Sequence, residues 1–372
     1  MRPDRAVVNS IAPGTRVEKG GATLEITGVR QRDAWQRNVL PPVEQVRPGF
    51  WSIPVPIPGN PLRYVLAYAF ACREGVTVVD PGWESEESWD ALVAGLAKAG
   101  FRPADVRAIL LTHMHPDHFG LAVRLRAESG AWIGMHRDDA ALVEAATTRE
   151  AESKLEEGLA QLAWAGAPRS VAAPATMLPA HRFPDQVGPE VLLEDGDRID
   201  LPGWDLRAVW TPGHTPGHLC FHERNEGILV TGDHVLPRIT PNISVVPGQL
   251  PEPLGTYLGS LRSIAEVEHV EVCPAHEYRF RGLRERVGVL LSHHGDRLTE
   301  IEKAVSEHPG GTCWGVTERL AWSRPFDTMT GFLVRLAVRE TLAHLLLLAA
   351  QGRLRFSDEP TARWYPVQEG SR

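Results

Sequence analysis

The chain lacks the usual marks of secreted, membrane or nucleic-acid-binding proteins. Its four cysteines form no CxxC pair, and in a chain of 372 residues they fit reduced thiols better than a disulfide framework. Residues 1–5 lack the apolar core of a signal peptide, and the most apolar run, residues 341–350, is too short to span a bilayer. Acidic residues outnumber basic ones by 47 to 39, so no general attraction to nucleic acid or anionic membrane is expected. We therefore expect a cytoplasmic protein without membrane contact.

The length suffices for two domains, and the apolar pattern predicts alternating strands and helices. Residues 1–48 read as irregular apart from one strand near 22–29, and they are interpreted as an N-terminal extension. A helix over 85–99 is predicted to begin at the N-cap Ser85 and to end at Gly100. Strands and helices occur in two separate halves of the chain, and this arrangement indicates two sheets packed face to face with helices outside. The other predicted elements are strands at 64–72, 76–80, 106–112, 132–135, 191–193, 206–210, 219–222, 227–231 and 270–272, and helices at 118–128 and 254–266.

Residues 138–190 interrupt this alternation. Their first half is charged, alanine-rich and helical, and their second half carries several prolines and is typical of loop. An insertion of this length in a compact domain is often a lid or a substrate wall, and the alternative is a solvated surface elaboration.

Residues 289–372 are predicted to form a separate, winged-helix-like unit. Helices are expected over 283–306 and 330–351, followed by a short hairpin at 352–356 and 363–365. A winged helix suggests nucleic acid, but residues 291–372 carry 10 Lys and Arg against 10 Asp and Glu, whereas a phosphate-binding wing has a basic excess. Nucleic acid is therefore disfavoured, and the apolar helix is expected to pack on the first domain or on a homodimer partner.

The densest group of metal-binding side chains is His113-Met114-His115-Pro116-Asp117-His118. His113 and His115 alternate along an extended segment, so both can point to the same side. Asp117 and His118 follow in the turn and can face a neighbouring cation. Imidazole and carboxylate groups are the ligands that zinc prefers, and a catalytic site keeps one position for water. The pattern therefore predicts a site for two metal ions.

Three segments further along the chain supply partners for this group. His214 lies in a tight loop rich in glycine and proline, at residues 211–218, directly after a strand. Asp233 ends an apolar strand, where a carboxylate can bridge two cations, and His276 follows another strand. All these residues can meet at the same edge of the fold.

These motifs, in this order, resemble the metallo-β-lactamase-fold hydrolases over about residues 49–290, and the bridging aspartate resembles the glyoxalase II-like branch. The resemblance implies the α+β class: a four-layer αβ/βα sandwich over residues 49–288, followed by the small helical domain. It implies that one metal is bound by His113, His115 and His214. It further implies that the other is bound by Asp117, His118 and His276, with Asp233 between the two.

Two close cations lower the pKa of a bridging water and hold hydroxide as the nucleophile, while one of them polarises the substrate carbonyl. Asp117 is then expected to orient that hydroxide or to move its proton. The leading hypothesis is hydrolysis of a small-molecule thioester, lactone or related ester. The alternatives are an endoribonuclease or phosphodiesterase, a β-lactam hydrolase, and a metal-stabilised binding protein without catalysis. Two divalent metal ions are expected, with zinc as the first choice, although His and Asp ligands suit zinc, iron and manganese alike.

Other residues carry weaker signals. Asp80 matches a strand-end aspartate of the family and is expected to hydrogen-bond a ligand histidine; the alternative is an ordinary turn cap. His218 is interpreted as a buried supporting histidine. Tyr278, Arg279 and Asn242 lie close to the same edge, and each is either a pocket residue or a plain surface residue.

Overall fold

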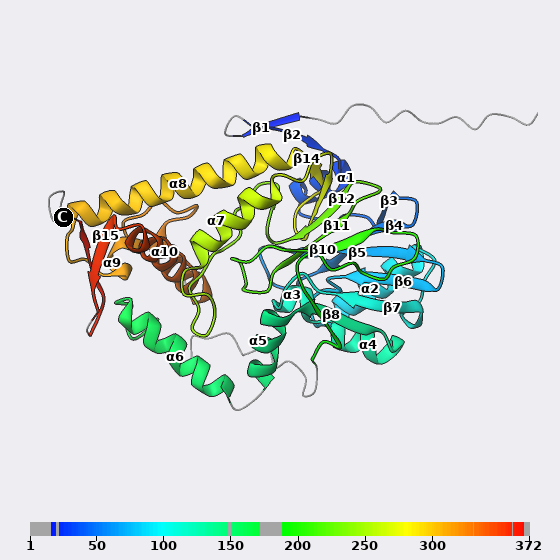
Figure 1. The fold of residues 1–372 in the computed structure, drawn as a ribbon, viewed down its shortest axis with the longest axis horizontal. Coiled ribbons are helices and arrows are strands. Elements are labelled where there is room, and N and C mark those ends of the chain that lie inside the picture. The colour runs from blue at the N-terminus through cyan, green and yellow to red at the C-terminus, as the bar shows by residue number, and fades with distance from the viewer. Residues whose placement is uncertain are drawn as a thin grey trace, which may run out of the picture.

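The fold places two β-sheets face to face with helices on their outer sides, as the sequence predicts (Figure 1). The computed structural model describes residues 16–367 except 20–21, 148–149, 172–187, 330 and 359. None of the helices it describes is long and apolar enough to cross a membrane.

The first sheet contains seven described strands, and all its neighbours are antiparallel except β12 and β13. Its order is β1 (Arg16–Lys19), β2 (Ala22–Ile26), β14 (Phe280–Arg281), β13 (Glu271–Pro274), β12 (Ile228–Gly232), β11 (Leu219–Glu223) and β10 (Leu206–Trp210).

The second sheet also contains seven described strands, and its last four run parallel. Its order is β3 (Glu44–Arg47), β4 (Phe50–Pro56), β5 (Tyr64–Cys72), β6 (Gly75–Val79), β7 (Val106–Leu110), β8 (Trp132–His136) and β9 (Val191–Leu193).

Ten α-helices are described. They are α1 (Val29–Gln36), α2 (Glu86–Lys98), α3 (Pro116–Phe119), α4 (Ala122–Ser129), α5 (Arg137–Thr147), α6 (Glu150–Trp164), α7 (Pro253–Ile264), α8 (Leu283–Glu307), α9 (Cys313–Thr317) and α10 (Phe332–Ala350). The helices α2 and α4 lie along the second sheet, α7 and the start of α8 lie along the first, and α6, α9 and α10 lie to one side of the sheets (Figure 1). A two-stranded hairpin, β15 (Leu354–Ser357) and β16 (Arg363–Pro366), follows α10.

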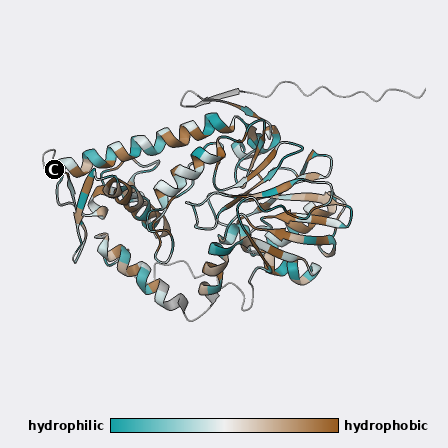
Figure 2. Cartoon of the chain, viewed as in Figure 1, coloured by the Kyte–Doolittle hydropathy of each residue, from teal (hydrophilic) through white to brown (hydrophobic). Residues whose placement is uncertain are grey.

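Apolar side chains fill the space between the sheets and the space beneath each helical layer. Phe50, Tyr68 and Phe70 of the second sheet meet Leu206 and Phe221 of the first, all without exposed surface or nearly so. Burying a side chain of this size stabilises the fold by about 1.5–3 kcal/mol. Figure 2 shows hydrophobic residues gathered in the strands and along α10, whereas α8 alternates between the two kinds.

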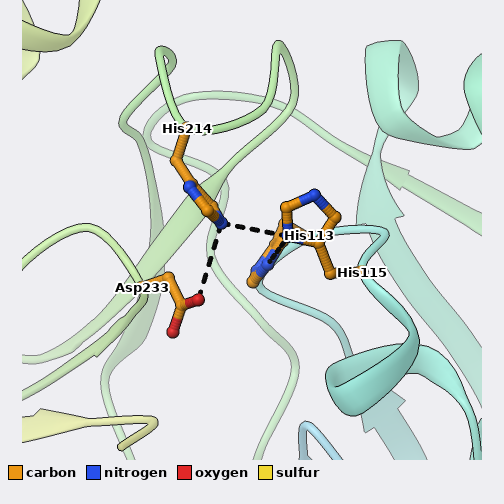
Figure 3. Close-up of side chains that lie close together, drawn as sticks. All are labelled: His113, His115, His214 and Asp233. Carbon is orange, nitrogen blue, oxygen red and sulfur yellow. Dashed lines mark hydrogen bonds and ion pairs between the residues drawn. The ribbon is translucent and has the colours of Figure 1, made fainter. Parts of the chain in front are cut away.

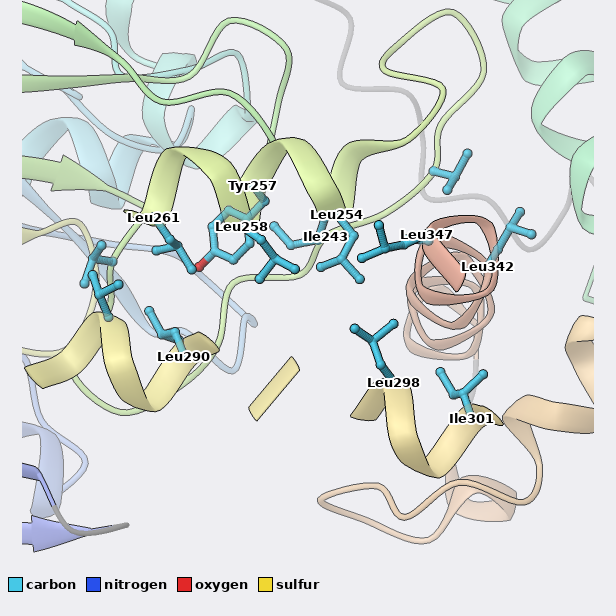
Figure 4. Close-up of a cluster of buried hydrophobic side chains, with 14 of the residues drawn as sticks. Ile243, Leu254, Tyr257, Leu258, Leu261, Leu290, Leu298, Ile301, Leu342 and Leu347 are labelled. Atoms are coloured by element: carbon cyan, nitrogen blue, oxygen red, sulfur yellow. The ribbon is translucent and has the colours of Figure 1, made fainter. Parts of the chain in front are cut away.

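A further apolar cluster joins α7, α8 and α10 to the outer face of the first sheet (Figure 4). Tyr257 and Leu261 of α7, Leu290 of α8 and Leu342 of α10 are all buried in it. The apolar helix of the tail therefore packs on the first domain, as one of the two sequence interpretations holds. The order of helices and hairpin agrees with the expected tail, while the winged-helix assignment itself and the boundary at 288 and 289 stay predictions.

Most predicted strands and helices are confirmed, and α2 begins as expected. The Ser85 hydroxyl accepts the Ser88 backbone N–H over 3.1 Å, and the chain leaves the helix at Gly100 with φ +91°. Two expectations were wrong. Within residues 1–48, the part that the structure describes is not irregular, because α1 and β3 lie there. The single helix over 118–128 is two short helices that meet near Gly120, where a Cβ would stand 2.5 Å from the Glu84 nitrogen.

The inserted segment begins with two helices, α5 and α6, as its charged, alanine-rich first half predicts. Its proline-rich second half lies mostly outside the described residues, so the lid stays a prediction.

Candidate metal centre

The candidate site lies where strands of both sheets end. The 113–118 segment follows β7, the 211–218 loop follows β10, Asp233 follows β12 and His276 follows β13. α3 begins at Pro116, whose fixed φ suits the first helical position, and this turn carries Asp117 and His118. The sheet edges therefore bring together all seven residues expected to bind metal.

The first group consists of His113, His115, His214 and Asp233, whose ligand atoms lie within 4.8 Å of one another. Figure 3 shows the three rings and the carboxylate turned toward one another. His115 Nδ1 lies 2.9 Å from His113 Nε2 and 3.0 Å from His214 Nε2, and His214 Nε2 lies 3.5 Å from Asp233 Oδ2. Three imidazole nitrogens and one carboxylate oxygen thus face one point.

The second group consists of Asp117, His118 and His276. His276 Nε2 lies 3.4 Å from Asp117 Oδ2, and His118 Nε2 lies 3.8 Å from the same oxygen. Asp233 Oδ1 lies 3.2 Å from His276 Nε2 and 3.6 Å from His118 Nε2. Asp233 therefore offers one oxygen to each group, which is the geometry of a carboxylate that bridges two cations.

Unsatisfied polar atoms show that these residues fit metal ions. His118 Nε2, His276 Nε2 and Asp233 Oδ1 are buried and make no hydrogen bond. A buried polar atom without a partner costs about 1–3 kcal/mol. A cation between the atoms would satisfy all three, and nitrogen and carboxylate oxygen are suitable donors for a divalent transition metal.

The protonation of the histidines differs between the two groups. Burial lowers the pKa of His113 and of His214, and it lowers that of His115 to about 3, so these rings are neutral as ligands must be. Burial alone would also lower the pKa of His276, but the charge of Asp233 outweighs it and raises the pKa to about 10. In the second group the carboxylates thus hold positive charge at the place expected for a metal.

Asp80 holds His118 in place. Its Oδ2 lies 2.8 Å from His118 Nδ1, and its two oxygens accept the Thr112 N–H over 2.8 Å and the Thr112 hydroxyl over 2.7 Å. Asp80 has φ +51°, a conformation that non-glycine residues rarely adopt. The expected hydrogen bond to a ligand histidine is present, and it turns Nε2 of that ring toward the site.

Backbone carbonyls hold two other ligand rings. His214 Nδ1 lies 3.0 Å from the Asn242 carbonyl oxygen, and His276 Nδ1 lies 2.9 Å from that of Tyr64. The Asn242 side chain points elsewhere: its amide donates to Glu340 of α10 over 2.9 Å. Asn242 thus reaches a ligand through its backbone and the tail through its side chain.

His218 is fully buried beside the first group. Its Nδ1 lies 2.8 Å from the Thr211 hydroxyl, and its Nε2 accepts the Asp233 backbone N–H over 3.3 Å. With both nitrogens engaged, the ring supports the Asp233 loop and has no free position for a metal.

Tyr278 and Arg279, which the sequence offered as pocket or surface residues, are both buried. Arg279 is 6% exposed, and its guanidinium donates to Glu271 over 2.5 Å and to Glu44 over 2.9 Å. Because Glu44 belongs to β3 and Glu271 to β13, Arg279 ties the two sheets together, and this geometry argues against a substrate contact. Tyr278 is also buried, which raises its pKa to about 12.

Asp139 is a supporting residue that the sequence analysis missed. Its carboxylate accepts the Met114 N–H over 2.9 Å, the Gly217 N–H over 2.7 Å and the Thr215 hydroxyl over 2.8 Å. It thereby joins the 113–118 segment to the 211–218 loop. The available signal was its position just after β8, because Asp80 and Asp233 also follow strands.

Comparison with known proteins identifies the same fold. The model of the metallo-beta-lactamase superfamily matches residues 61–276. Lactamase-like protein adaB of Aspergillus niger is 26% identical over 343 residues, which cover 88% of this chain and 89% of that protein. The probable metallo-hydrolase YqjP of Bacillus subtilis is 23% identical, with 75% and 86% covered.

Two solved structures are similar over most of the chain. A metallo-beta-lactamase family protein from Thermus thermophilus gives a TM-score of 0.73 at 29% identity, covering 87% of this chain and all of that one. A beta-lactamase domain protein from Burkholderia ambifaria gives 0.71 at 26% identity, with 87% and 93% covered.

Proposed function

Because the chain belongs to the metallo-β-lactamase superfamily of hydrolases, we propose that it uses two divalent metal ions, with zinc as the expected metal, to hydrolyse an activated acyl bond of a small molecule. The bond is a thioester, a lactone or a related ester. The observation that carries this proposal is the position of Asp233, which presents one oxygen to each of two adjacent ligand groups.

When bound, two cations supply charge that polarises an acyl carbonyl and lowers the pKa of a water between them. The remaining work falls to the residues of the chain. Within the second group the side chain of Asp117 is 13% exposed, whereas those of His118 and His276 are fully buried, so Asp117 is the member of that group that solvent water reaches. We expect its carboxylate to orient the attacking water and to accept its proton. Asp80 and the Asn242 carbonyl keep the ligand rings from turning.

The buried cysteines offer no alternative nucleophile. Burial raises the pKa of the Cys220 thiol to about 12 and that of the Cys313 thiol to about 12. A thiol attacks as thiolate, so these two side chains are inert at neutral pH. Water is therefore the nucleophile that fits the site.

Charge supports an acyl substrate over a phosphodiester. The formal net charge is −8, and residues 291–372 are neutral overall. Polynucleotide backbones bind through an excess of Lys and Arg. The endoribonuclease alternative therefore has less support than a small-molecule substrate.

The homodimer considered from the sequence stays a prediction, which size-exclusion chromatography with light scattering can test.

Metal analysis and a substrate panel test the proposal. We expect about two metal ions per chain and hydrolysis of acyl thioesters or lactones that a chelator abolishes and added metal restores. The panel also contains a β-lactam, RNA and bis(p-nitrophenyl) phosphate. Asp117→Asn should lose turnover, while the exposed control Asp296→Asn on α8 should keep it. Cleavage of RNA without acyl hydrolysis would refute the proposal.

A further inference from the structure

The tail helix α10 lies directly against the loop that supports His214. The Val245 N–H donates to the Arg339 carbonyl over 3.4 Å, and the Asn242 amide donates to Glu340 over 2.9 Å. Since Asn242 contacts His214, the backbone of Arg339 lies roughly 15 Å or less from that ligand by the reach of three residues. Residues 339 and 340 therefore contact the loop that carries Asn242, which in turn contacts His214.

Arg339 has no carboxylate partner among the residues that the structure describes, and its buried Nε makes no hydrogen bond. Its guanidinium lies against α6, where a Cβ added at Gly158 would stand 3.0 Å from Nη2. A glycine inside a helix is less favourable than alanine, and here it leaves room for this group.

The Arg339 side chain is only partly exposed to water. Burial, and then the charge of Arg335 one helical turn earlier on α10, lower the pKa of Arg339 to about 10. A largely desolvated cation without a partner is costly, and it becomes favourable when an anion is bound.

We propose that Arg339 binds a carboxylate or phosphate that the substrate carries away from the hydrolysed bond. The substrate class is thus an acyl compound with a remote anionic group, which rests on the hydrolase function proposed above. The planar guanidinium fork of arginine suits both anions. The anion can belong to the acyl part, as a terminal carboxylate, or to the leaving group, as a phosphate.

Matched thioesters distinguish these two sources. At each of two acyl chain lengths, eight and twelve carbons, three thioesters are compared. Two are N-acetylcysteamine thioesters whose acyl chain ends either in a methyl group or in a carboxylate. The third is the coenzyme A thioester of the methyl-ended chain, which places the phosphates on the leaving group. The wild type should prefer one of the anionic compounds in kcat/KM over its neutral match.

The variants Arg339→Gln and Arg339→Lys test the residue itself. Arg339→Gln should lower kcat/KM about 10- to 100-fold for the preferred anionic substrate, mainly through KM, and leave the neutral substrate unchanged. Arg339→Lys should restore part of the loss. The exposed tail residue Arg324 provides the control Arg324→Gln, which should behave as wild type. Arg339→Gln should also raise the Tm or leave it unchanged, because it removes a partly buried charge that has no carboxylate partner among the described residues.

A binding measurement separates this proposal from the proposed function. Calorimetry on the metal-loaded protein compares dicarboxylic acids with monocarboxylic acids of the same chain length, and coenzyme A with dephosphorylated pantetheine. Suppose that no thioester is hydrolysed but that Arg339→Gln abolishes a preference of the wild type for an anionic ligand. The anion subsite would then be supported and the thioesterase function would be refuted. Equal loss for anionic and neutral ligands, a lowered Tm, or no anion preference in the wild type would overturn the subsite.

Discussion

Replacing Asp139 with alanine is the sharpest test of how the candidate metal centre is held together. Its carboxylate is fully buried and accepts three hydrogen bonds, two of them from the backbone N–H groups of Met114 and Gly217. Met114 lies between two expected metal ligands, and Gly217 lies three residues after His214. Asp139→Ala should therefore destabilise the fold and loosen the ligands together.

The expected loss can be estimated from the groups left without partners. The two buried N–H groups would each cost about 1–3 kcal/mol, whereas the Thr215 hydroxyl can rotate toward another acceptor. Water that enters the space returns part of this energy. We expect the free energy of unfolding to fall by about 2–5 kcal/mol, a large share of the total stability of a typical domain. Metal affinity should fall by about tenfold or more.

Urea unfolding followed by circular dichroism, with and without metal, measures the first effect, and competition with a chelating dye measures the second. The neighbouring Asp138→Ala is the matched control, because the Asp138 side chain is 45% exposed. That variant should remain within about 0.5 kcal/mol of the wild type. Equal stability and equal metal affinity of the two variants would refute the role assigned to Asp139.

Three further predictions concern activity, the tail and pH. Asp117→Asn should lower kcat at least 100-fold at equal metal loading; a smaller loss would show that Asp117 does not handle the proton. Glu340→Gln should weaken the hydrogen bond from the Asn242 amide and lower metal affinity several-fold, as measured by dye competition. Unchanged affinity would show that the tail does not support the candidate metal centre. Burial raises the pKa of Asp139 from 3.8 to about 6, so the folded state binds this proton more tightly, and stability falls as pH rises through that range. Urea titrations should show wild type gaining about 1.4 kcal/mol over Asp139→Asn between pH 7.5 and pH 5.0, and a pH-independent difference would contradict this.

The sequence could predict that the expected metal ligands lie together, because they are dense and stand at strand ends. His113 to His118 form one short motif, and His214, Asp233 and His276 each follow an apolar run. The helix α2 was equally readable, since Ser85 is a strong N-cap. The sandwich followed from the alternation of strands and helices.

Contacts between segments that are distant in the chain could not be predicted from the sequence. Glu340 reaches Asn242 across 98 residues, and no local pattern marks either residue. Arg279 was interpreted as a pocket or surface residue, because one of its carboxylate partners, Glu44, lies 235 residues away in the sequence. Asp139 was assigned to an insertion since it stands outside any motif. The short α1 and β3 carry too little periodicity to stand out.

The helix α8 has a consequence for how this protein can vary. Its 25 residues extend about 37 Å from the first sheet to the tail hairpin. Leu283 and Val287 near its start, and Ile301 and Val305 near its end, belong to one buried cluster. A chain cut at 288 would break this helix within its second turn and expose apolar surface on both pieces. The tail therefore cannot be exchanged as an independent module, because its apolar side chains must fit those of the first sheet and α7.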